Sequence, residues 1–176
     1  ALYYDADKEI IWIGTHLGGL NKLDIRSGHF THYRMEEGNP ATLPSDIIRD
    51  IIPYKSLLII ATQNGVCLFD PANGQCQQLF KDSKEGKSIK MVADVTFDSE
   101  GTLWIAATGE GVFSYRFDTC RLTNYRHDAT NPNSLSNNNV NNITQDSKGN
   151  LWFSTSGSGL DLYLSLIHIS EPTRPY

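Results

Sequence analysis

The stretch Leu151-Trp152-Phe153-Ser154-Thr155, followed by Gly159-Leu160, decides the fold because versions of it recur along the chain. Each version has an apolar strand core, a small residue and Thr, and then Gly with an apolar residue. The earlier copies are Ile11-Trp12-Ile13-Gly14-Thr15 with Gly19-Leu20, Leu58-Ile59-Ile60-Ala61-Thr62 with Gly65-Val66, and Leu103-Trp104-Ile105-Ala106-Ala107-Thr108 with Gly111-Val112. The Gly recurs at positions 19, 65, 111 and 159, which gives spacings of 46, 46 and 48 residues. A constant period of this length indicates repeated supersecondary units.

Each period contains four short runs of strand-forming residues separated by turn residues, as the third copy shows. Its runs are 91–97, 102–107, 112–117 and 121–125, with Gly and Asp at the corners between them. Gly accepts a positive φ, and Asp can satisfy the backbone of a turn with its own side chain. No segment has the periodicity of an amphipathic helix. The sequence therefore predicts an all-β fold, a partial β-propeller of about 3.5 four-stranded antiparallel blades with a repeat near 46 residues.

The period also sets the expected boundaries, which are 1–44, 45–89, 90–136 and 137–163 for the four blades. Trp12, Trp104 and Trp152 fall on the second strand of their blades, where a large aromatic side chain can fill the space between sheets. Blade two has Ile59 there, so we expect a looser contact. The chain has no initial Met and too few blades for a closed ring of about four to eight. We therefore expect a piece of a longer protein.

The last residues, 164–176, break the pattern. They resemble a translated reading frame of a sequencing-library adapter, and we exclude them from the fold as an artefact. The remaining chain keeps the acidic balance of the whole, which has a net charge of −5. Scattered Lys and Arg form no basic stripe, so this segment is expected to contact neither nucleic acid nor an anionic membrane surface.

A search for chemistry finds no arrangement typical of an enzyme. Cys67, Cys76 and Cys120 have no metal-binding spacing, and we interpret Cys76 as a small buried hydrophobic residue. His29 and His32 are three apart on a strand, which places them on opposite faces. There is no nucleophile–base pair and no phosphate-binding loop before a helix. The sequence thus predicts no catalytic residue, no metal and no cofactor in this fragment.

Binding residues are expected at one end of the blades, where the long connections at about 34–43, 81–88 and 126–135 emerge. Long loops on a rigid scaffold often carry binding residues. Where these connections enter the first strand of the next blade, apolar positions repeat while polar positions differ between blades. Such side chains offer donors and acceptors to a polar, hydroxyl-rich or charged ligand, although ordinary solvated residues would look the same. The candidate ligand-binding residues are Asp46, Arg49, Lys90, Asn138, Asn141 and, in a turn, His16.

These residues also carry a family resemblance. The string Asn131-Pro132-Asn133-Ser134-Leu135-Ser136-Asn137-Asn138, continued by Val140, Ile143, Asp146 and the stretch 149–155 with Gly159-Leu160, resembles the two-component regulator propeller repeat. Blade one is similar, whereas blade two has Ile59 in place of Trp and lacks the Asn-Pro-x-Ser-Leu phrase. The likeness covers residues 1–163.

The resemblance implies a periplasmic sensor region of a hybrid two-component receptor of the Bacteroidetes kind, anchored in the inner membrane and carrying a histidine kinase. It implies missing blades of the same chain, a homodimeric parent and a ligand among the oligosaccharides released from glycans. It identifies no ligand residues, because the repeats are structural. Two other interpretations remain open: a propeller lyase or hydrolase, and a structural docking propeller of another receptor.

Overall fold

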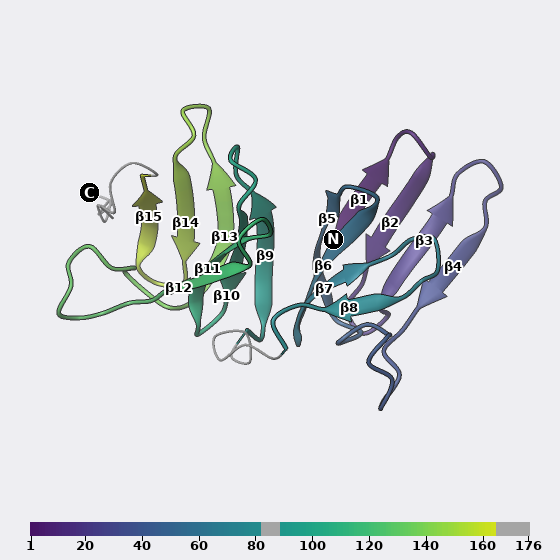
Figure 1. Ribbon diagram of the computed structural model, residues 1–176, viewed down its shortest axis with the longest axis horizontal. Coiled ribbons are helices and arrows are strands. Elements are labelled where there is room, and N and C mark those ends of the chain that lie inside the picture. Colours follow the sequence, from purple (N-terminus) through teal and green to yellow (C-terminus); the bar gives the residue numbers. More distant parts are fainter. Residues whose placement is uncertain (82–88, 165–176) are drawn as a thin grey trace. The chain divides into compact units, whose positions relative to one another are not determined.

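The computed structural model describes residues 1–81 and 89–164, and these residues contain strands and no helix (Figure 1). The predicted all-β fold is confirmed. Most of the connection at 81–88 and of the excluded tail at 164–176 lies outside the described residues.

The strands form antiparallel sheets in which neighbours in sequence are neighbours in space. The first sheet contains β1 (Leu2–Asp5), β2 (Ile10–Gly14), β3 (Leu20–Asp24) and β4 (Phe30–Tyr33). The second contains β5 (Ile48–Tyr54), β6 (Leu57–Thr62), β7 (Gly65–Phe69) and β8 (Cys76–Gln78). The third contains β9 (Val92–Phe97), β10 (Leu103–Ala107), β11 (Gly111–Arg116) and β12 (Arg121–Tyr125). The fourth has three described strands, β13 (Val140–Gln145), β14 (Leu151–Thr155) and β15 (Gly159–Tyr163). This meander is the topology of a propeller blade.

The chain divides into two compact units. The first holds the sheets β1–β4 and β5–β8, and the second holds β10–β15 with nearly all of β9. Each unit therefore consists of two blades joined by one long connection, and each is described by itself below.

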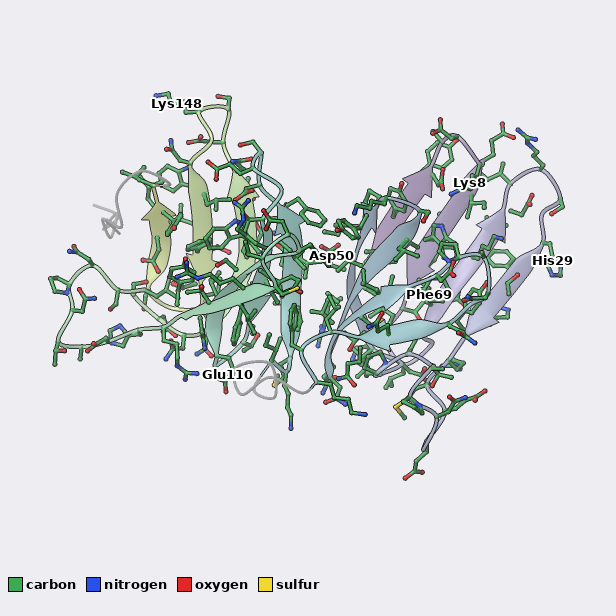
Figure 2. The ribbon with its side chains drawn as sticks, viewed as in Figure 1. Lys8, His29, Asp50, Phe69, Glu110 and Lys148 are labelled. Carbon is green, nitrogen blue, oxygen red and sulfur yellow. The ribbon has the colours of Figure 1, made fainter. Side chains whose placement is uncertain are left out.

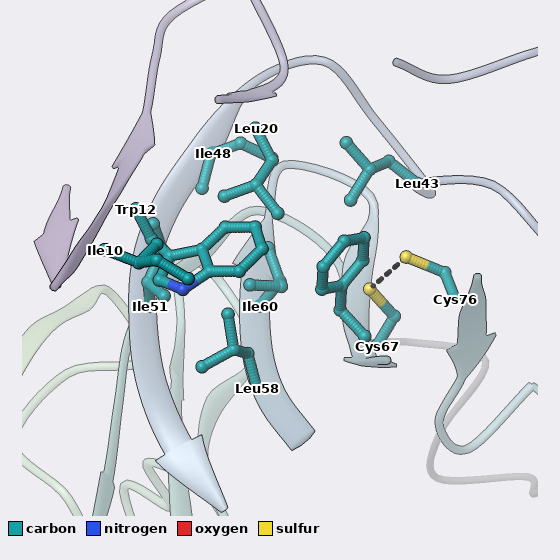
Figure 3. Packing of buried hydrophobic residues seen from close by; sticks show 11 residues of the cluster. Ile10, Trp12, Leu20, Leu43, Ile48, Ile51, Leu58, Ile60, Cys67 and Cys76 are labelled. Atoms are coloured by element: carbon teal, nitrogen blue, oxygen red, sulfur yellow. Dashed lines mark hydrogen bonds between the residues drawn. The ribbon is translucent and has the colours of Figure 1, made fainter. Parts of the chain in front are cut away.

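The core of the first unit lies between its two sheets and includes the first repeated Trp (Figure 3). Trp12 on β2 is only 1% exposed. Its ring meets Phe69 on β7 edge-on, with ring centroids 5.4 Å apart, and Tyr33 on β4 lies at 6.1 Å. Aromatic pairs in such tilted and edge-on arrangements add to the free energy of apolar burial. The expected role of Trp12 between blades is confirmed.

The second unit repeats this packing around Trp104. This side chain on β10 is 3% exposed, and its ring lies 5.8 Å from Phe153 on β14 and 4.9 Å from Tyr163 on β15. Trp152 is different, because it is only half-buried while its neighbours Leu151 and Phe153 face the core. Successive side chains of a strand point to opposite faces, so Trp152 lies on the other face of its sheet. At the same position of blade two, Ile59 is completely buried.

In two blades, an Asp in the turn between the first and second strands accepts a hydrogen bond from the indole N–H of the Trp. Asp146 accepts hydrogen bonds from the indole Nε1 of Trp152 at 3.0 Å and from the backbone and side-chain nitrogens of Asn150 at 2.9 Å. Asp98 makes the same indole contact with Trp104, at 2.7 Å. The hydrogen bonds from Trp152 and then Asn150 hold the pKa of Asp146 well below its ordinary value of 3.8.

This turn predicts an acid-sensitive part of the stability. Because the pKa of Asp146 is lower in the folded chain, its contribution is complete above pH 3.8 and is lost as the pH falls towards the folded pKa. When the pH is lowered from about 6 to about 3, we expect the urea midpoint of the Asp146→Asn variant to fall less than that of the unmodified chain. Asp7→Asn, in an exposed turn, is the control and should follow the unmodified chain. Equal acid sensitivity of Asp146→Asn and the unmodified chain would contradict the prediction.

Candidate functional site

The candidate residues lie at the loop end of the sheets, which we define as the end carrying the turns between second and third strands. In the first unit the turn 15–19 is bonded to the segment that enters β5. The amide of Gly19 donates to the carbonyl of Asp46 at 2.9 Å, and the amide of Ile48 donates to the carbonyl of Thr15 at 3.0 Å. Backbone hydrogen bonds between the two blades thus fix the start of β5.

The side chains of Arg34 and Asp46 complete this junction. The Arg34 guanidinium donates to the carbonyl of Leu17 and lies 3.3 Å from the Asp46 carboxylate. The other carboxylate oxygen of Asp46 accepts the backbone N–H of Met35 at 2.8 Å. Asp46 therefore fastens both the start of the long connection and the neighbouring turn, which gives it a structural role.

The second unit has the same junction with different side chains. The amide of Gly111 donates to the carbonyl of Asn138 at 2.9 Å, and the Asn138 side chain accepts the N–H of His127 at 2.7 Å. Arg126 bonds to the carbonyl of Gly109 and pairs with Glu110. Asn138 thus occupies the place that Asp46 has in the first unit. Figure 2 shows Glu110 at one end of this unit and Lys148, in a turn between first and second strands, at the other.

Two of the candidate residues occupy β-bulges. The register of β5 with β6 shifts between Ile48 and Asp50, and that of β13 with β14 shifts between Val140 and Asn142. The residues inside these shifts, Arg49 and Asn141, are both exposed. A bulge redirects a side chain and often lies beside a functional site. The fold therefore presents a different polar side chain at an equivalent point of each unit.

The predicted residues are divided between the two units. His16, Asp46, Arg49 and Lys90 belong to the first unit, and Asn138 and Asn141 belong to the second. His16 is exposed in its turn, and Lys90 is exposed beside Met91, whose amide donates to the carbonyl of Gln63 at 2.7 Å. Their role in ligand binding stays a prediction.

Arg34 and Arg126 were not among the predicted site residues, although both take part in the junction. The sequence contains a pattern that points to these two residues, because Tyr33-Arg34 and Tyr125-Arg126 are 92 residues apart, or two periods. A recurring Arg at the start of a connection indicates a conserved contact within the repeat, and here it contacts the turn between second and third strands.

An open depression of about 570 Å³ adjoins this junction in the first unit. Among the predicted candidate residues, His16 lines this depression, and its other lining residues were not predicted. The Nδ1 of His32 and the Oδ1 of Asn21 form a 2.6 Å hydrogen bond across β3 and β4. The lining residues are Thr15, His16, Gly18, Asn21, His32 and Arg34. This set could hydrogen-bond hydroxyl groups of a ligand.

A cavity of about 230 Å³ in the second unit needs a different interpretation. It lies between the connection 126–135 and β15, and Asp161 on β15 is 1% exposed with one carboxylate oxygen unpaired. In the first unit the corresponding place is filled by β8, where the amide of Cys76 donates to the carbonyl of Ala41 at 2.7 Å. Among the described residues the fourth sheet has no such strand. We therefore interpret this cavity as the position that a fourth strand of this sheet would occupy, rather than as a ligand pocket.

The described residues contain no grouping of three or more His, Cys, Asp or Glu that could hold a metal ion. Within the same part of the chain, no helix has the length and apolar character needed to cross a bilayer.

Comparisons with known proteins agree with the repeated architecture. Residues 134–157 match the sequence profile of the family described as two component regulator propeller. This match includes the Asn138 junction, the Asn141 bulge and the Asp146 turn. A search of curated proteins gives no match.

Solved structures with a similar fold include two from B. thetaiotaomicron. The extracellular domain of the hybrid two-component system BT3049 matches with a TM-score of 0.81 and 23% identity over 97% of this chain and 22% of that chain. The extracellular domain of the hybrid two-component system BT4673 matches with a TM-score of 0.71 and 22% identity over 92% and 20%. This chain thus spans about a fifth of the length of these two structures.

The likeness extends to a propeller of another kind. The WD40 β-propeller domain of Doa1 matches with a TM-score of 0.63 and 9% identity, over 93% of this chain and 49% of that chain. At such low identities the structural likeness shows the fold alone, whereas the family match at residues 134–157 rests on the amino-acid sequence. The chain is therefore a β-propeller segment in which residues 134–157 match the two-component regulator propeller repeat.

Proposed function

We propose that the chain is part of the extracytoplasmic, periplasmic sensor region of a hybrid two-component receptor that responds to oligosaccharides derived from glycans. The observation that carries the proposal is the family match at residues 134–157. The two similar structures from B. thetaiotaomicron are extracellular domains of hybrid two-component systems, which supports the same assignment. The segment itself binds the ligand and transmits the signal, and any kinase activity belongs to other parts of the parent protein.

The loop end supplies the residues for the proposed ligand. Arg49 and Asn141 are exposed at equivalent bulges, so they can differ between blades without disturbing the sheets. Asp46 and Asn138, in contrast, hold the junctions and would contribute to binding by positioning the connections. An oligosaccharide presents many hydroxyl groups, and guanidinium and amide groups can hydrogen-bond several of them.

A binding experiment tests the ligand class. The longest protein containing this chain is titrated by calorimetry with oligosaccharides from partially hydrolysed plant and host polysaccharides. Arg49→Ala is expected to weaken binding of the recognised sugar about tenfold, because one hydrogen bond to a charged group is worth about 1.5 kcal/mol. Lys148→Ala, at the opposite end of a sheet, is the control and should bind normally. No binding of any fraction, or equal losses in both variants, would count against the proposal.

The parent gene tests the receptor assignment separately. We expect the reading frame to continue into further blades that complete the ring, a membrane span and a histidine kinase. We also expect the purified sensor region to be a homodimer by light scattering. A complete reading frame without a membrane span and kinase would refute the assignment, whatever the result with sugars.

A further inference from the structure

Two cysteines of the first unit lie against each other in its core. Cys67 on β7 and Cys76 on β8 have their Sγ atoms 3.2 Å apart, as the dashed line in Figure 3 shows. Cys67 is completely buried and Cys76 is 6% exposed. The third cysteine, Cys120, is exposed and belongs to the second unit. The close pair therefore consists of these two thiols.

The strand register brings these thiols together at diagonal positions. Cys76 pairs with Phe69, and Cys67 pairs with Gln78, so the two cysteines are one diagonal step apart on neighbouring antiparallel strands. Diagonal neighbours are usually about 7–8 Å apart, farther than the usual Cα separation of about 4.4–6.8 Å in a disulfide, so bond formation requires the backbone of β8 to move. A disulfide has an S–S length of about 2.05 Å, so the sulfur atoms would need to approach by about 1 Å. β8 is a three-residue strand at the edge of its sheet, and this makes a shift of that size feasible.

The surroundings favour a bond between these sulfurs over other chemistry. Hydrogen bonding with Cys76 and burial both raise the pKa of Cys67, so this thiol stays protonated and reacts slowly with reagents from solvent. Cys76 is the more accessible of the two and would react first. Its nearest sulfur neighbour then lies within contact distance, which favours closure within the chain over a lasting adduct.

We propose that Cys67 and Cys76 form an intrachain disulfide that fastens the edge strand β8 to β7 when the protein meets a disulfide oxidant. In the first step the Cys76 thiolate attacks one sulfur of the oxidant's disulfide, and one oxidant thiol leaves. Cys67 then gives up its proton and attacks the Cys76 sulfur, and the second oxidant thiol leaves. Overall, two protein thiols lose two protons and two electrons to form one S–S bond, and the oxidant disulfide is reduced to two thiols.

The test uses the full chain with Cys120→Ser, which leaves this pair as its two cysteines. The folded protein is incubated with glutathione disulfide, unfolded in urea with a maleimide, and weighed by mass spectrometry. We expect a loss of about 2 Da, from two hydrogen atoms, and no maleimide adduct. After treatment with a reductant, two maleimides should be added. Peptide mapping should place the bond between residues 67 and 76.

Two outcomes would overturn the proposal. One is a protein that still takes up two maleimides after oxidation, and the other is oxidation that yields only glutathione adducts or covalent dimers. The variant with both Cys76→Ser and Cys120→Ser is the control, and it should not show the 2 Da loss. Because the main test leaves both buried cysteines unchanged, it does not depend on whether this control folds.

Discussion

Replacing Trp12 by Ala is expected to lower the free energy of unfolding of the first unit by about 3–5 kcal/mol, the usual cost of removing a buried aromatic side chain. Trp12 is 1% exposed and contacts Phe69 from the neighbouring sheet. The truncation would leave a cavity between two sheets that a rigid backbone cannot close. Urea unfolding followed by circular dichroism, with hydrogen exchange of β2 and β7, measures the loss.

Trp152→Ala is the matched control, since Trp152 has the same position in its repeat but is only half-buried. We expect this variant to lose about 1 kcal/mol, mainly the indole hydrogen bond to Asp146 and part of its apolar contact. Losses of the same size in both variants would contradict the conclusion that Trp12 stabilises the chain by packing between sheets.

Gly111→Ala is expected to destabilise the second unit by about 3 kcal/mol, because strain and overlap add together. Gly111 has a φ of 83°, and a Cβ atom there would lie 2.2 Å from the carbonyl oxygen of Tyr125. That oxygen belongs to the backbone of β12, so it cannot rotate away as a flexible side chain could. This position corresponds to the Gly that recurs at every period of the sequence.

Gly101→Ala separates the two contributions within the same sheet. Gly101 has a φ of 79°, but no heavy atom lies within 4 Å of the place of its Cβ. We expect a loss of about 1 kcal/mol, from the positive φ alone. Thermal unfolding of both variants checks the prediction, and a Gly111→Ala variant as stable as Gly101→Ala would show that the Tyr125 overlap is relieved.

The fold could be predicted from the sequence because one pattern repeats, and each copy supports the others. Strand limits in the third sheet agree with those predicted to within about one residue, the usual uncertainty of strand ends. Trp152 shows where the pattern is insufficient. Its repeat position predicts burial between sheets, but burial depends on a neighbouring sheet that the repeat itself does not contain.

The candidate site was less predictable because it depends on contacts between repeats. Comparison of the repeats within this chain identifies Asp46 and Asn138 as variable polar residues, but it does not show that each fastens a long connection to a neighbouring turn. The bulges at Arg49 and Asn141 arise from strand register, which residue types alone do not reveal. The contact between Cys67 and Cys76 likewise depends on how β7 and β8 are aligned.

A double-mutant cycle on Trp12 and Phe69 tests the central claim that the two repeats of the first unit are sheets packed face to face through these aromatic residues. The free energy of unfolding is measured for the unmodified chain, Trp12→Ala, Phe69→Ala and the double variant. Their rings lie 5.4 Å apart on different sheets, so we predict a coupling energy of about 1 kcal/mol. Additive losses, with no coupling between the two side chains, would contradict this packing.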